Sequence, residues 1–122
     1  MTLRKTTLAF LALAALATPA WADLGVTAKA AKGVEKHLPV GEATEFAVKD
    51  TVWVWTEVTG GEGKKIKHVW KRDGKDEWSI ELPVGSKKWV TNSRRVVKAG
   101  SYVVEIQGED GAKLTEVAFT VK

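Results

Sequence analysis

The chain has 122 residues, a length that suits a single domain, and carries a formal net charge of +4. It contains no cysteine, which excludes disulfides, thiolate nucleophiles and thiolate metal ligands.

Residues 1–22 have the three parts of a secretory signal peptide. Arg4 and Lys5 supply the charged start, residues 8–16 form a short apolar stretch, and an Ala-Trp-Ala motif ends the segment. The apolar stretch is shorter than the roughly 20 residues that a membrane-spanning helix needs. We therefore expect cleavage after Ala22, a periplasmic or secreted product, and no transmembrane segment in the mature chain.

Loss of this segment also changes the charge. Removing two basic residues and no acidic one lowers 19 basic residues to 17 against 15 acidic residues, a net charge of +2. So small a charge gives little reason to expect nucleic acid as a partner. Without disulfides, the remaining domain has to be held together by its buried core, to which large aromatic side chains contribute most.

The mature chain divides into two parts. Residues 23–43 have mixed character, and we expect an irregular N-terminal segment or a first edge strand. Residues 44–122 predict one β-sandwich domain, because apolar and polar residues alternate and turn signals recur about every ten residues. The clearest expected strands cover residues 51–58, 64–72, 78–84, 89–97, 101–107 and 114–121. The fold class is therefore all-β, an antiparallel β-sandwich of about seven strands.

Alternation within these strands predicts which residues share a face. Val52, Val54, Thr56 and Val58 lie on one face of the first clear strand, and Trp53 and Trp55 lie on the other. Since both faces are apolar, we expect neighbours to cover this strand on both sides. In the strand at 89–97, Trp89, Thr91, Ser93 and Arg95 are in phase. Asp73-Gly74 predicts a tight hairpin turn.

Four blocks of residues together resemble a known bacterial family. They are Gly33-Val34 with Pro39-Val40-Gly41, Phe46 and residues 52–58; Ile66, His68-Val69-Trp70 and Asp73-Gly74-Lys75; Leu82-Pro83-Val84-Gly85 with Trp89, Thr91 and Ser93; and Gly100-Ser101-Tyr102 with Val104, Asp110-Gly111, Leu114, Phe119 and Val121. Over residues 30–122 the chain resembles the domain of unknown function 2914. The resemblance implies an exported or membrane-attached protein with an immunoglobulin-like sandwich, and it brings no established activity with it.

His68 is the strongest candidate for chemistry. It lies two residues before Trp70 on one strand face, where it could be a ligand or a general base beside an aromatic wall. Alternatively, it is a partly buried histidine that forms a hydrogen bond with a Thr or Ser across the sheet, for instance Thr91 or Ser93. We favour the second interpretation, because a metal site needs several convergent ligands and a triad needs a defined geometry. The acidic residues form no convergent pair, so we expect no catalytic residue, metal or cofactor, and no enzyme.

The tryptophans allow two interpretations. Trp53, Trp55, Trp70, Trp78 and Trp89 fall on four consecutive expected strands. Large apolar side chains are usually buried, which places most of them in the core. The alternative is that one or two stand on an exposed sheet face and stack on sugar rings, and Trp53 with Trp55 has the spacing for such a pair.

The basic residues gather on two expected strands. They are Lys64, Lys65, Lys67, Lys71 and Arg72 on one, and Lys87, Lys88, Arg94, Arg95 and Lys98 on the other. If the two strands are neighbours, they form one positive face for a polyanion such as a polysaccharide. The alternative is a solvated face whose lysines protect an edge strand.

Together these features predict a non-catalytic, exported interaction module that binds a protein or a cell-envelope component. The alternative is a carbohydrate-binding module that uses exposed tryptophans. The candidate binding residues are Trp53, Trp55, His68, Trp70, Trp89, Arg94 and Arg95.

Overall fold

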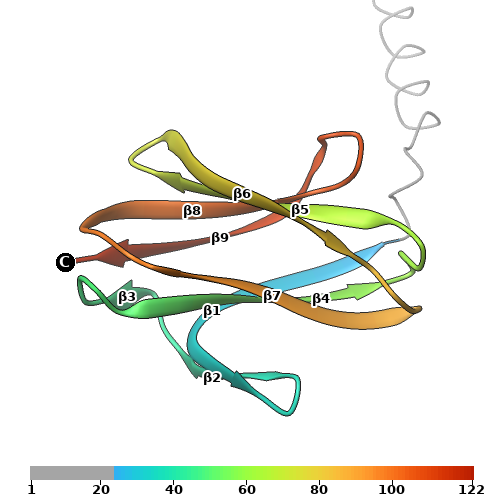
Figure 1. Cartoon of the computed structure of the whole chain (residues 1–122), viewed down its shortest axis with the longest axis horizontal. Coiled ribbons are helices and arrows are strands. Elements are labelled where there is room, and N and C mark those ends of the chain that lie inside the picture. The colour runs from blue at the N-terminus through green and yellow to red at the C-terminus, as the bar shows by residue number, and fades with distance from the viewer. Residues whose placement is uncertain (1–23) are drawn as a thin grey trace, which may run out of the picture.

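The computed structural model describes residues 24–122, so the expected signal peptide at 1–22 lies outside the described residues. In this part the chain folds into two β-sheets that pack face to face, without a helix (Figure 1). The strands are β1 (Gly25–Glu35), β2 (Leu38–Glu42), β3 (Glu45–Phe46), β4 (Thr51–Thr59), β5 (Lys65–Arg72), β6 (Lys75–Pro83), β7 (Lys88–Val96), β8 (Gly100–Gln107) and β9 (Lys113–Val121).

Sheet A has the strand order β2-β1-β4-β7, and sheet B has the order β3-β9-β8-β5-β6. The paired strands are antiparallel except β3, which runs parallel to β9. The predicted all-β sandwich is confirmed, but the described residues form nine strands in place of about seven, because the sequence predicts neither β2 nor β3. The segment expected to be irregular or a first edge strand contains β1, which lies between β2 and β4, so β2 takes the edge of sheet A.

The strand arrangement matches an immunoglobulin-like sandwich. β1, β4 and β7 take the places of strands A, B and E, and β5, β8 and β9 take those of strands C, F and G. Trp70 in β5 is 1% exposed, at the place where antibody domains bury a tryptophan. Val104, two residues after Tyr102 in β8, is fully buried where those domains have a cysteine.

The core lies between the two sheets. Because successive side chains of a strand point to opposite sides, every second residue of each strand points into this core. Val52, Val54, Thr56 and Val58 of β4 are all fully buried, as their spacing predicts. The buried side chains of sheet B that meet them include Ile66, Trp70, Tyr102, Val104, Ile106 and Phe119. Four aromatic pairs with edge-to-face geometry and one stacked pair consolidate this side of the core.

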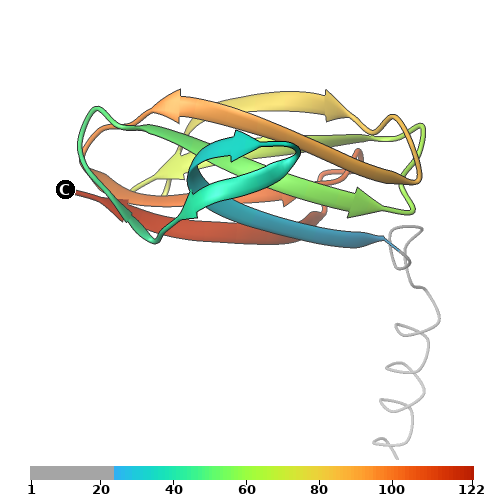
Figure 2. The same ribbon diagram turned by 90° about the horizontal axis from the view of Figure 1, so that it is seen from below.

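The β1–β2 hairpin covers part of the outer face of sheet A (Figure 2). Its two turn residues, Lys36 and His37, have positive φ angles of 51° and 65°, which are uncommon outside glycine and asparagine. The indole N–H of Trp55 donates a hydrogen bond to the carbonyl oxygen of His37 at 2.8 Å. Trp55 is thereby 6% exposed although it faces outward from β4, which explains why both faces of this strand are apolar.

Tyr102 stands at the start of β8 and fixes the corner after β7. Its hydroxyl oxygen accepts a hydrogen bond from the backbone N–H of Lys98 at 3.1 Å, four residues upstream. The same hydroxyl donates to a carboxylate oxygen of Glu77 at 3.3 Å. This is the tyrosine corner of immunoglobulin-like domains.

The Tyr102→Phe variant tests this corner. We expect the free energy of unfolding to fall by about 1 kcal/mol, because the ring keeps its packing while the hydroxyl loses both hydrogen bonds. Urea denaturation of the variant and of Ser101→Ala, an exposed neighbouring change, measures the difference. An unchanged unfolding midpoint for Tyr102→Phe would contradict a stabilising corner.

Candidate functional site

A buried hydrogen-bond network joins the two sheets around His68. The imidazole of His68 in β5 lies 3.0 Å from the hydroxyl oxygen of Thr56 through Nε2 and 2.6 Å from that of Ser93 through Nδ1. The indole N–H of Trp70 donates to the same Ser93 oxygen at 3.0 Å. Thr56 and Ser93 belong to β4 and β7, so sheet B supplies the two rings and sheet A the two hydroxyls.

The chemistry of these groups favours one direction of proton donation. The Trp70 indole can only donate, so the Ser93 oxygen accepts from it, and the Ser93 hydroxyl is free to donate to Nδ1 of His68. Nε2 of His68 then carries the ring proton and donates to Thr56. In the opposite tautomer, Ser93 would accept twice and its own proton would lack a partner within the network.

Burial keeps His68 neutral. Its side chain is fully buried, and the loss of solvation lowers the pKa of the imidazole from 6.5 to about 4. A second ring proton would force the Ser93 hydroxyl to turn away from Nδ1 inside the core. Both effects disfavour the charged form.

A serine beside a histidine is also the pattern of an activated nucleophile, but this pair differs from one. The ring nitrogen of His68 that points away from Ser93, Nε2, forms its hydrogen bond with the hydroxyl of Thr56. In a catalytic triad, a carboxylate that orients the ring occupies this position. Thr56 is 0% and Ser93 is 5% exposed, so the network lies inside the sandwich. No group of three or more His, Asp or Glu side chains between residues 24 and 122 is placed to hold a metal ion.

Of the two hydrogen-bond partners that the sequence suggested for His68, the structure shows Ser93 and not Thr91. Ser93 bonds to the ring, but across the interface between sheets and not along one sheet. Thr91 lies on the same inward face of β7 as Ser93. The second hydrogen bond of His68, however, goes to the hydroxyl of Thr56 in β4. The sequence signal that could identify Thr56 is its position as the one polar residue among the inward valines of β4.

The tryptophans separate into core and surface residues. Trp55 and Trp70 are buried, so the structure offers no exposed pair of Trp53 and Trp55 for stacking on a sugar ring. Trp89 packs against the core at the end of β7, and its ring leaves no room for a side chain at Gly85. Trp53 remains half-buried on the outer face of sheet A.

Two arginines of β7 stack on tryptophans on opposite sides of sheet A. The guanidinium of Arg94 lies 4.7 Å from the ring centre of Trp53, its cross-strand partner on the outer face. The guanidinium of Arg95 lies 4.8 Å from the ring centre of Trp78 in β6. Arg95 thus contacts sheet B where the edges of the two sheets face each other, a structural role that the sequence did not predict.

The condition for a single positive face, that the two basic strands are neighbours, is not met. The two basic segments lie on β5 in sheet B and β7 in sheet A, so they are not neighbours. On β5, Lys71 pairs with Glu105 at 3.2 Å, and Arg72 donates to Glu77 at 2.7 Å. Partial burial raises the pKa of Glu77, but the hydrogen bond and charge of Arg72 outweigh it and hold that pKa below its usual value.

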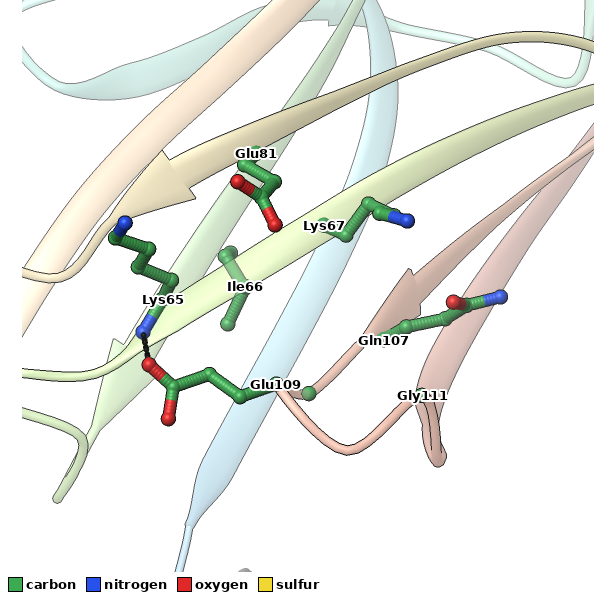
Figure 3. Close-up of a pocket in the computed structure, with 8 residues that line it drawn as sticks. Lys65, Ile66, Lys67, Glu81, Gln107, Glu109 and Gly111 are labelled. Carbon is green, nitrogen blue, oxygen red and sulfur yellow. Dashed lines mark hydrogen bonds between the residues drawn. The ribbon is translucent and has the colours of Figure 1, made fainter.

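A pocket of about 200 Å³ lies at one end of sheet B (Figure 3). Lys65 and Lys67 of β5, Glu81 of β6, and Gln107 and Glu109 from the end of β8 line it. The backbone N–H of Lys65 donates to a carboxylate oxygen of Glu109 at 3.1 Å, which closes one wall. With two lysines and two glutamates, the lining favours neither anions nor cations.

Three of the four exposed large apolar side chains of residues 24–122 belong to β2 and β7, the two edge strands of sheet A. Val96 of β7 is 64% exposed and follows Arg94 on the same face. Leu38 and Val40 of β2 are 61% and 43% exposed, on the hairpin whose turn contacts Trp55. We call the neighbouring side chains Trp53, Arg94 and Val96 of β4 and β7 the sheet A patch. Of these, the sequence had singled out Trp53 and Arg94 alone.

Comparison with known proteins supports the family resemblance. No helix between residues 24 and 122 is suited to crossing a bilayer. No curated protein matches the chain. The family model described as "Protein of unknown function (DUF2914)" matches residues 63–121, which span β5 to β9. The N-terminal blocks of the resemblance, up to β4, lie outside this match. The match supports the resemblance to the DUF2914 family over the segment from β5 to β9.

Proposed function

We propose that this protein is an exported, non-catalytic binding module that holds a protein or another cell-envelope component on sheet A. The observation that carries the proposal is the sheet A patch, where the 64% exposed side chain of Val96 lies on the same strand face as Arg94, which stacks on Trp53. Exposed apolar groups beside an aromatic and an arginine are typical of protein interfaces. The burial of the His68 network favours a structural role for the residues that most resemble a catalytic pair.

The export half of the proposal rests on the signal peptide expected at residues 1–22. We expect N-terminal sequencing of the protein from a periplasmic or culture fraction to begin at Asp23. Replacement of Ala20 and Ala22 by bulky residues should block cleavage, because the processing site requires small side chains there. A protein that retains Met1 in the cytoplasmic fraction would contradict export.

Photo-cross-linking in intact cells tests the binding half. A photoreactive phenylalanine analogue at Val96 is expected to give a discrete adduct with one partner. The same analogue at Ala118, an exposed residue on the outer face of sheet B, is the matched control and should give none. A second change, Trp53→Ala, should remove the adduct at Val96. Equal adducts from both positions, or no adduct at Val96, would overturn the proposal.

Carbohydrate binding remains the alternative, and the geometry supports it less. Only Trp53 of the proposed stacking pair reaches the surface, and the Arg94 guanidinium lies over its ring. A sugar would have to displace that guanidinium. A glycan array with wild type and Arg94→Ala compares the two functions, since glycan binding that increases in the variant would favour the alternative.

A further inference from the structure

β7 is the edge strand of the described residues that only charged side chains protect. Proteins usually blunt their edge strands with proline, bulges, short length or charged side chains. The other three edges have such devices: β2 contains Pro39, β3 has only two residues, and β6 ends in Pro83 and pairs with β5 across a register shift. β7 has nine residues, no proline or glycine, and pairs with β4 without interruption.

The backbone of β7 presents a row of free hydrogen-bonding groups. Gly60 donates to the carbonyl of Lys87, and Val97 donates to the carbonyl of Asp50, which sets the phase of the β4–β7 ladder. Because bonding positions alternate in antiparallel pairs, residues with odd numbers in β7 bond to β4. The N–H and C=O groups of Val90, Asn92, Arg94 and Val96 therefore point away from the sheet. No hydrogen bond within the described part of the chain uses them.

The charge of this edge indicates what kind of strand fits it. β7 contains Lys88, Arg94 and Arg95 and no acidic residue, and exposed Lys87 and Lys98 flank it. Lys88 contacts Glu57 of β4 at 3.8 Å, and Arg94 has no carboxylate partner among the described ion pairs. A second copy pairing β7 with β7 would bring six positive charges into one strand pair, which is unfavourable. An acidic strand would instead place its carboxylates beside these cations.

We propose that the free edge of β7 binds an extended, acidic peptide segment of a partner protein by strand addition. The added strand bonds to the backbone of Val90, Asn92, Arg94 and Val96, and its acidic side chains meet Arg94 and Lys88. Two residues of this edge, Arg94 and Val96, also belong to the sheet A patch. The inference thus rests on the proposed binding function and names the chemistry of the partner segment.

Selection from a displayed library of random 12-residue peptides tests the proposal. We expect the enriched peptides to be rich in Asp and Glu and low in Pro. On titration with such a peptide, the amide signals of Val90, Asn92, Arg94 and Val96 in nuclear magnetic resonance spectra should shift most. Failure to enrich any peptide, or enrichment of basic peptides, overturns the proposal.

Two pairs of variants locate the binding edge. Asn92→Pro removes one outward N–H and should weaken binding at least about tenfold. Ser79→Pro makes the same change at an outward position of the β6 edge and should leave binding unchanged. Independently of proline, Arg94→Glu should weaken binding about tenfold, whereas Lys75→Glu on β6 should not. Equal affinities within either folded pair contradict binding at β7.

The outcomes separate this inference from the function on which it rests. If Val96 forms a cross-link in cells but no acidic peptide is selected, the binding function stands and the strand addition is wrong. If the β7 amides of the protein alone shift with its concentration, the edge pairs with a second copy, which also overturns the proposal. If neither cross-link nor peptide is found, both fail.

Discussion

The Trp70→Ala variant is expected to lose about 3–5 kcal/mol of its free energy of unfolding, the range for removing a large buried aromatic side chain. Trp70 is 1% exposed, and its ring packs edge to face with Trp78, Tyr102 and Phe119. Its indole N–H also donates to Ser93, so the truncation leaves a cavity and disturbs the link between the sheets. Since a small domain has only about 5–15 kcal/mol of stability, this loss removes a large share of it, and the variant should unfold at a much lower denaturant concentration than wild type.

Trp70→Phe separates the two causes. The smaller ring keeps much of the packing but has no N–H for Ser93, so we expect a loss of about 1–2 kcal/mol. Denaturant unfolding followed by circular dichroism measures both variants against wild type. A loss below about 1 kcal/mol for Trp70→Ala would show that the core does not depend on this ring.

The second large effect is a loss of stability in mild acid that originates at His68. The pKa of its imidazole is about 4 in the folded protein, against 6.5 when unfolded. As the pH falls below 6.5, the unfolded chain binds a proton that the folded protein does not, so unfolding becomes more favourable. The loss continues until the pH passes the folded pKa, and it amounts to roughly 3 kcal/mol in all.

His68→Gln is the variant that isolates this effect. Glutamine does not titrate, and its amide can both donate and accept between Thr56 and Ser93. Between pH 7 and pH 5, the free energy of unfolding of wild type should fall by about 2 kcal/mol more than that of the variant. Both proteins contain His37, so the difference comes from His68. Carboxylates such as Glu77 and Glu105, whose pKa values are lowered, contribute mainly at more acidic pH. Parallel stability curves for the two proteins over this range would exclude His68 as the cause.

Local pattern was sufficient for the strands and their inward faces. Successive side chains of a strand point to opposite sides, so the spacing of Val52 and Val54 predicts their burial without knowledge of the partner strand. Asp73 and Gly74 likewise predict their hairpin, and both have the positive φ angles that such a turn requires. The hairpin turn at Lys36 and His37 lacks these residue types. Its His37 carbonyl oxygen instead accepts a hydrogen bond from Trp55, which lies 18 positions further along the chain.

Pairing between distant strands is what local pattern does not encode. Ser93 and Thr91 share one phase, and only the packing of β5 against β7 decides which of them meets His68. The basic residues of β5 and β7 are divided between two sheets because the chain crosses over after β6. The same crossover places β7 at an edge with its backbone groups free, and it buries Trp70 and His68 between the layers.

The sequence by itself thus determined that this protein is an all-β domain with a tryptophan-rich core, because alternation, turn residues and composition act over a few neighbouring positions. Its expected export rests on a segment outside the described residues. Only the tertiary structure decided that Trp55 is covered, that His68 joins the sheets, and that β7 is the open edge. These depend on contacts between residues far apart in the chain, whose energies arise from packing and burial and not from local preference.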